Sequence, residues 1–124
     1  MCAPIVRTMA AAPGHVTLDL DLPADLPCFR GHFPGFPVLA GVIQLDWVMQ
    51  LGAAYLQCGQ KSATDFRIKF LRLIVPDTPL RLTLDHDAAR HRLDFVYSTG
   101  DRSTGDRSTG DRVASRGRVT LAAP

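Results

Sequence analysis

The 124 residues are enough for one domain with its own core and too few for two. Hydrophobic residues make up 46% of the chain and charged residues 21%, an ordinary balance for a globular protein, which argues against disordered and fibrous classes. The net charge of +2, without a basic stripe interleaved with aromatics, argues against nucleic acid as a partner.

The N-terminal segment MCAPIVRTMAAAPG lacks the charged start and unbroken apolar stretch of a signal peptide. Three cysteines, Cys2, Cys28 and Cys58, lie far apart and form no C-x-x-C pair. An odd number in this arrangement argues against a disulfide framework and for a reducing compartment. We therefore expect a cytoplasmic protein.

The first patterned element is a strand over residues 16–22. Apolar and polar residues alternate along it, as in a strand with one buried face. The apolar set is Val16, Leu18, Leu20 and Leu22, and the polar set is Thr17, Asp19 and Asp21. Pro23, Pro27 and the Gly/Pro-rich run over residues 31–37 then interrupt regular structure.

A helix is predicted from Gly41 to about Cys58, with apolar residues on nearly every face. A membrane span over residues 38–56 is disfavoured, because Gln44, Asp46 and Gln50 interrupt it and a carboxylate at the bilayer centre costs roughly 2.5–3.5 kcal/mol. The helix should therefore be enclosed by other elements of the domain. Gly52 suggests close packing of the sheet against one of its turns.

Four more strands follow, over residues 65–75, 80–84, 93–97 and 113–121, and we expect them to form a meander. In the first, Phe66, Ile68 and Phe70 should point inward, and a change of phase near Leu71 suggests a bulge. Residues 76–79 are predicted to form a turn. The fold class is therefore α+β, an antiparallel sheet wrapped around one long central helix, which is the hot-dog fold.

The segment 98–112 consists of three tandem STGDR pentapeptides between two predicted strands. We interpret it as an expanded hairpin loop, because a repeat this polar has no apolar face to bury. A role in ligand binding is the less favoured alternative. Residues 1–124 then form a single domain.

The chemistry is concentrated in residues 29–50. His32 lies in a rigid Gly/Pro-rich loop, where a group that titrates near neutral pH can be aimed. Gly41 starts the helix, so its N–H is available at the positive end of the helix dipole to hold negative charge. Asp46 lies on an otherwise apolar helix, where desolvation favours the protonated acid, and Gln50 is placed to hydrogen-bond it. Taken singly, His32 and Asp46 each have a structural alternative. His32 could be a packed histidine, and Asp46 could be an exposed or helix-capping residue.

No other pattern competes with this one. His15 and His91 flank strands, and Asp85-His86-Asp87 is predicted to be a solvated turn rather than a weak metal site. Glycine-rich phosphate loops and G-x-S-x-G elbows are absent from the sequence. We therefore expect neither a metal nor a cofactor.

The segment G-H-F-P-G-x-P-V-x-x-G-V, with an acid fourteen residues after the histidine, resembles the 3-hydroxyacyl-[acyl-carrier-protein] dehydratases of bacterial fatty-acid synthesis. Asp46 resembles the branch that uses Asp rather than Glu. The downstream KFLRLIVPDTPLRLTL is similar to the same family, and VIQLDW resembles the small dehydratases of aryl-polyene and xanthomonadin-type pigment clusters.

The resemblance implies catalysis by His32 as base and Asp46 as acid, with Gly41 as the oxyanion donor. It also implies that the Val38 carbonyl orients the histidine, that Gln50 supports the acid, and that Phe33, Pro34 and Gly35 contact substrate. The family places the two catalytic groups on different protomers, so it implies a homodimer or larger homo-oligomer, or a heterodimer with another hot-dog subunit. Ala40 departs from the family, which usually has proline there.

The predicted function is dehydration of 3-hydroxyacyl thioesters on acyl carrier protein to trans-2-enoyl thioesters, in fatty-acid or polyene-type lipid synthesis. Two alternatives stay open: a hot-dog acyl thioesterase and a non-catalytic hot-dog subunit. Because acyl carrier proteins are typically acidic, Arg30, Arg67, Lys69 and Arg72 are candidates for docking the carrier, although a merely solvated strand face is comparably plausible.

Overall fold

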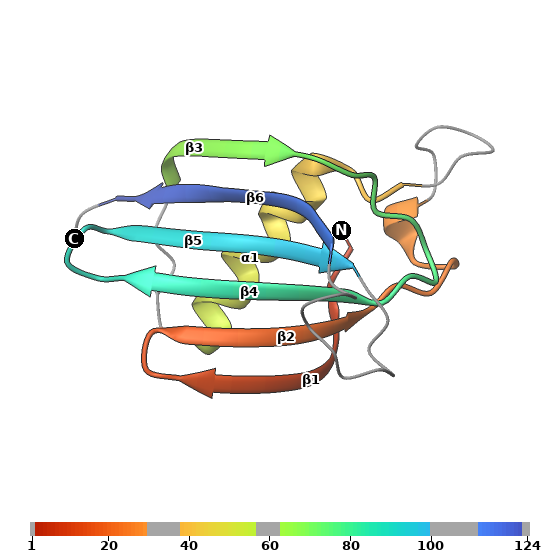
Figure 1. The fold of residues 1–124 in the computed structure, drawn as a ribbon, viewed down its shortest axis with the longest axis horizontal. Coiled ribbons are helices and arrows are strands. Elements are labelled where there is room, and N and C mark those ends of the chain that lie inside the picture. The colour runs from red at the N-terminus through yellow and green to blue at the C-terminus, as the bar shows by residue number, and fades with distance from the viewer. Residues whose placement is uncertain (1, 30–37, 57–62, 100–111, 123–124) are drawn as a thin grey trace.

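The computed structural model describes residues 2–29, 38–56, 63–99 and 112–122. In these ranges the chain forms one antiparallel sheet, one α-helix and one short 3-10 helix, η1, at Pro27–Phe29. The strands are β1 (Ile5–Ala12), β2 (His15–Asp21), β3 (Ala63–Phe70), β4 (Leu80–Asp87), β5 (Arg92–Thr99) and β6 (Arg112–Leu121). The helix, α1, spans Gly41–Tyr55 and crosses one face of the sheet obliquely (Figure 1). This arrangement confirms the predicted fold class.

The core lies between α1 and the sheet. The predicted alternation is confirmed in β2, β4 and β5, whose buried side chains are Val16, Leu18, Leu20, Leu80, Leu82, Leu84, Leu93, Phe95 and Tyr97. The buried positions of α1 are spaced by three, four and one, which defines one face of a helix: Gln44, Trp47, Val48, Leu51 and Gly52. Trp47 is fully buried, and its indole Nε1–H donates to the Cys2 carbonyl at 3.1 Å.

The strand order β1-β2-β4-β5-β6-β3 corrects the predicted four-strand meander. Strands β4, β5 and β6 do form a meander, but β3 pairs with β6 at one edge of the sheet, and β4 pairs with β2. Strand β1, at the opposite edge, was not predicted. Seven of its eight residues are exposed, so its sequence carries no alternation of apolar and polar residues.

The edge position of β3 also explains a wrong prediction about its side chains. Ile68 packs against the core as expected, whereas Phe66 and Phe70 are 48% and 55% exposed. The change of phase near Leu71 is present: the N–H groups of Leu71 and Arg72 both donate to the Ala114 carbonyl, at 2.8 and 3.0 Å. Two consecutive residues just after β3 thus face a single residue of β6, which is the arrangement of a β-bulge.

The enclosure of α1 is only partial, because Val42 on its first turn is 68% exposed. The helix ends at Tyr55, before Cys58, which lies outside the described residues. Within the described ranges, no helix is long and apolar enough to cross a bilayer.

Two further expectations are wrong. Cys2 forms a disulfide, which weakens the case for a reducing compartment; the side chains of Cys28 and Cys58 lie outside the described part of the chain. Asp85-His86-Asp87 is not a turn but the end of β4, paired with β5. The predicted turn at residues 76–79 is confirmed, with Asp77 at a φ of 60°.

Candidate active site

The start of α1 is built by two residues. Ala40 is its N-cap, with φ −63° and ψ 147°, and the Ala40 carbonyl accepts hydrogen bonds from the N–H groups of Ile43 and Gln44 at 3.0 and 3.1 Å. Gly41 is the first helical residue. Its N–H therefore belongs to the group at a helix start that has no acceptor within the helix, at the positive end of the helix dipole.

The ring of Phe70 lies directly against Gly41. A Cβ atom added to Gly41 would be 2.7 Å from Cζ of Phe70, closer than real Cβ contacts. Because Phe70 is half exposed, its ring forms an apolar wall beside the first turn of α1. The absence of a side chain at position 41 leaves the space that the end of the Phe70 ring occupies.

The predicted acid, Asp46, lies in the second turn of α1 and is half-buried. Nε2 of Gln50 donates a hydrogen bond to Oδ2 of Asp46 at 2.7 Å, which is the contact that their spacing of four residues predicts. At about 1.5 Å of rise per residue, the backbone of Asp46 lies about 7.5 Å along the helix axis from Gly41. The Asp46 carboxyl is thus held on the same helix whose first N–H group has no acceptor within the helix.

Val38, whose carbonyl is implied to orient the histidine, is 6% exposed and lies three residues before Gly41. The structure therefore places Val38 just before α1, Gly41 at its first position, and the hydrogen-bonded pair Asp46 and Gln50 in its second and third turns. His32, Phe33, Pro34 and Gly35 lie outside the described residues, so their predicted roles stay predictions.

Sequence reasoning missed a buried polar cluster behind this site. Gln44 is 4% exposed, and Ser115 and Tyr97 are fully buried. The Tyr97 hydroxyl donates to the Gln44 backbone carbonyl at 2.6 Å, and Ser115 Oγ donates to Gln44 Oε1 at 2.7 Å. The three-residue spacing of Gln44 from Trp47 would have placed Gln44 on the buried face, but the sequence does not reveal its partners on β5 and β6.

Tyr97 is not available as an acid or base near neutral pH. Burial, and secondarily the negative charge of Asp46, raise its pKa well above the ordinary value. The phenol therefore stays protonated and acts as a hydrogen-bond donor to the helix.

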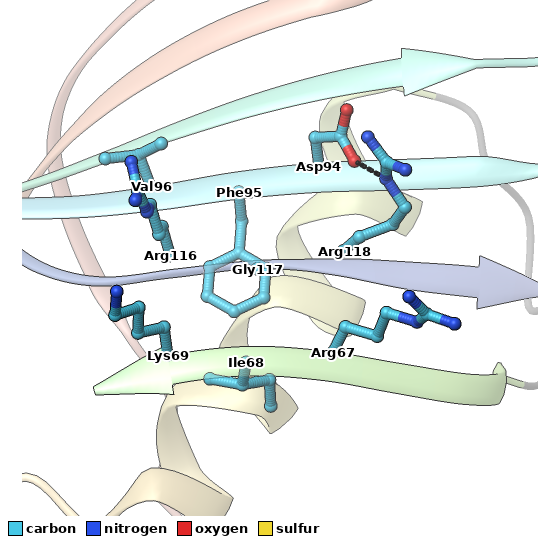
Figure 2. Close-up of a pocket in the computed structure, with 9 residues that line it drawn as sticks. All are labelled: Arg67, Ile68, Lys69, Asp94, Phe95, Val96, Arg116, Gly117 and Arg118. Carbon is cyan, nitrogen blue, oxygen red and sulfur yellow. Dashed lines mark hydrogen bonds and ion pairs between the residues drawn. The ribbon is translucent and has the colours of Figure 1, made fainter.

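A second candidate surface is a groove of about 460 Å³ over β3, β5 and β6, on the sheet face away from α1. Figure 2 shows Lys69 and Arg116 on one side of Gly117, and Arg67 and Arg118 on the other. Arg118 pairs with Asp94 at 2.9 Å, whereas Arg67 approaches Asp65 only to 3.8 Å. The groove thus carries more positive than negative charge.

Of the predicted docking residues, Arg67 and Lys69 line this groove. Arg72 is exposed but does not line it, and Arg30 lies outside the described residues. Among the described side chains there is no cluster of three or more potential metal ligands.

Comparison with known proteins gives a consistent result. The family model described as ApeI-like, ApeI dehydratase, matches residues 8–109. A 3-hydroxyacyl-[acyl-carrier-protein] dehydratase FabZ of Syntrophomonas wolfei is 32% identical over 68% of this chain. The match covers 64% of the length of that curated relative.

Solved structures agree on the fold. A chain of the dehydratase heterocomplex ApeI:P from Xenorhabdus doucetiae superposes with a TM-score of 0.81 and 32% identity, over 97% of this chain and 98% of that one. Mouse thioesterase superfamily member 2 superposes with a TM-score of 0.63 at 14% identity, over 94% of this chain and 87% of that one. The second likeness, at that identity, shows a shared fold and nothing about the reaction.

Proposed function

Because the chain belongs to the ApeI-like dehydratase family, we propose that it removes water from 3-hydroxyacyl thioesters carried by acyl carrier protein. The product is the trans-2-enoyl thioester, in fatty-acid or polyene-type lipid synthesis. The observation that carries the proposal is the arrangement on α1, where the Gly41 helix start and the Asp46 carboxyl, hydrogen-bonded by Gln50, lie within two turns.

In the proposed reaction His32 removes the proton at C2 of the substrate. The negative charge that develops on the thioester oxygen is held by the Gly41 N–H at the positive helix end. Asp46 gives its proton to the hydroxyl at C3, which leaves as water. The proton on His32 then returns Asp46 to its acid form through solvent, so no cofactor is consumed.

The test is the mass of the carrier protein after incubation with a panel of 3-hydroxyacyl forms. Wild-type protein should lower the carrier mass by one water molecule, while a thioesterase would release the whole acyl group. His32→Ala and Asp46→Asn should each slow the loss of water by about 10²–10⁴-fold, because each removes one general acid–base step. Near-normal turnover in either variant, with its circular dichroism and melting temperature preserved, would remove that residue from the mechanism.

We also propose that the active form is a dimer, either of two copies or with another hot-dog subunit. Two features of the described chain support it. The edge strand β3 has its outer side unpaired in the single chain, and the apolar side chains of Phe66, Phe70, Leu71 and Leu73 are exposed on and just after it. An exposed sheet edge with this much apolar surface is typical of a protein interface.

The acyl carrier protein is proposed to dock on the groove of β3, β5 and β6, because its acidic surface complements the groove's charge. Lys69 precedes Phe70, which lies against Gly41, so the groove reaches the same end of β3 as the candidate site, on the opposite face of the sheet. Lys69→Glu should raise KM for the carrier-bound substrate, most strongly at low salt, and leave turnover of a small pantetheine thioester unchanged.

Arg90→Glu, on the turn between β4 and β5, makes the same change of charge at an exposed position outside the groove and serves as the control. An equal effect of the two substitutions on KM would show that the groove is not the docking surface. We also propose that the reaction takes place in the cytoplasm, where the Cys2 disulfide is expected to be reduced.

A further inference from the structure

Leu39 lies between two residues of the candidate site, Val38 and Gly41, and both of its backbone polar groups are held. Its N–H donates to the Ile74 carbonyl at 2.7 Å. Its carbonyl accepts a hydrogen bond from Nε2 of Gln44 at 3.0 Å. The first bond ties the segment to the chain that follows β3, and the second ties it to the buried face of α1.

The Gln44 side chain is itself fixed. Ser115 Oγ on β6 donates to Gln44 Oε1 at 2.7 Å, which leaves the Gln44 amide nitrogen facing the Leu39 carbonyl. Since Ser115 is fully buried and Gln44 is 4% exposed, no solvent competes for these bonds. The orientation of the Gln44 amide is therefore set by the sheet, and the position of Leu39 follows from it.

We propose that Gln44 and Ser115 are positioning residues for the dehydratase site: they hold the Val38 carbonyl and the Gly41 N–H in place relative to the substrate. The inference rests on the proposed function of that site. Neither side chain touches substrate; both act through the backbone of residues 38–41. A displacement of about 1 Å at a reacting geometry can cost about 10²-fold in rate, so loosening this segment should be visible in kcat.

The residue at position 40 does not itself fix the backbone of residues 38–41, which leaves a role for the hydrogen bonds of Gln44. The φ of Ala40, −63°, is the value that a proline ring imposes, but alanine leaves the angle free to vary. In this chain the Gln44–Ser115 pair therefore supplies a restraint that the residue at position 40 does not.

The test separates positioning from stability. Gln44→Met keeps the side-chain length and removes both hydrogen bonds, leaving the Ser115 hydroxyl buried without this acceptor. Gln44→Met/Ser115→Ala removes that hydroxyl as well, so part of the lost stability should return. We expect kcat to fall about tenfold or more in both variants, with little change in KM, and not to recover in the double variant.

Adding Ala40→Pro to the double variant should restore most of kcat, because proline fixes the observed φ. Val48→Ala is the control: it opens a cavity in the same helix face, at a fully buried residue, and removes none of these bonds. It should lower the melting temperature while leaving kcat nearly unchanged. Recovery of kcat in parallel with stability in the double variant would overturn the proposal, as would a kcat within about twofold of wild type in Gln44→Met.

A second readout does not depend on activity. Amide hydrogen exchange at residues 39–43 should accelerate in Gln44→Met and not in Val48→Ala. Unchanged exchange at these residues would overturn the proposed restraint even if the wild-type protein dehydrated its substrate. Conversely, a wild-type protein without dehydratase activity but with the accelerated exchange in Gln44→Met would refute the proposed function and leave the restraint in place.

Discussion

Gly41 and Gly117 both lie at close approaches, and they differ in what an added methyl group would meet. At Gly117 a Cβ would lie 2.3 Å from the backbone carbonyl oxygen of Arg67 and 3.0 Å from the Phe95 ring. At Gly41 it would meet the end of the Phe70 ring, which is half exposed and able to rotate away. The contact at Gly117 involves the backbone of β3, which is paired with β6 and cannot move away without breaking that pairing.

Gly117→Ala should therefore destabilise the protein by about 1–3 kcal/mol, the usual cost of an overpacked site. At about 4–8 °C per kcal/mol for a small domain, its melting temperature should fall clearly below that of Gly41→Ala, which should stay close to wild type. Thermal unfolding of the two variants side by side measures the difference. Equal melting temperatures would mean that β3 and β6 do not approach as closely as described.

Tyr97 gives the stability of the protein a dependence on alkaline pH. Its pKa is raised above the ordinary value of 10.0, first by burial and then by Asp46, so above pH 10 the folded chain keeps a proton that the unfolded chain has lost. The stabilising contribution is complete below pH 10 and is lost as the pH rises toward the folded-state pKa, by up to about 1.4 kcal/mol per pH unit.

Tyr97→Phe removes this ionisation, so its stability should fall less steeply with pH above 10, although it starts lower because the bond to the Gln44 carbonyl is gone. Urea midpoints of both proteins, measured on either side of pH 10, give the two slopes. Identical slopes would mean that Tyr97 ionises freely in the folded protein.

At the level of the elements, the parts that the sequence predicted best are those with two-residue alternation and one buried face. Strands β2, β4 and β5 belong to this class. The helix start at Gly41 was also predicted correctly, from the apolar run that follows the Gly/Pro-rich segment. Strand β1 was missed because it is an exposed edge, and β3 was misplaced because alternation defines the buried face of a strand but not its neighbour. The pairing of β3 with β6 depends on contacts between residues about 50 positions apart, such as Phe66 with Val119.

In the candidate site, too, contacts between residues close in sequence could be predicted and contacts between distant residues could not. The Asp46–Gln50 bond depends only on helical spacing, so the sequence was sufficient to predict it. The Gln44–Ser115 and Tyr97 bonds join α1 to β5 and β6, and no local pattern marks them. Residues 100–111 of the pentapeptide repeat lie outside the described residues. The ends of the repeat, Ser98, Thr99 and Arg112, belong to β5 and β6, which remain paired up to Thr99 and Arg112, as a hairpin with a long loop requires.

For the whole molecule, the described chain holds only part of the proposed chemistry on α1, with an exposed sheet edge beside it. The resemblance implies that the catalytic pair is divided between two protomers, with His32 from one and Asp46 from the other. In a symmetric dimer any contact between His32 of one copy and Asp46 of the other is repeated with the two copies exchanged, so two such sites would form together. A mixture of two differently inactivated copies should then contain one intact site in every mixed dimer.

The measurement that tests this account most directly is therefore complementation. His32→Ala and Asp46→Asn proteins are mixed in equal amounts, subunit exchange is verified by mass spectrometry of the intact dimers, and formation of the enoyl thioester is followed. Half of the dimers are mixed and each carries one intact site, so we predict about a quarter of the wild-type rate, where each variant alone is nearly inactive. No enoyl product after verified exchange would contradict a dehydratase site made of His32 and Asp46 from two copies of this chain.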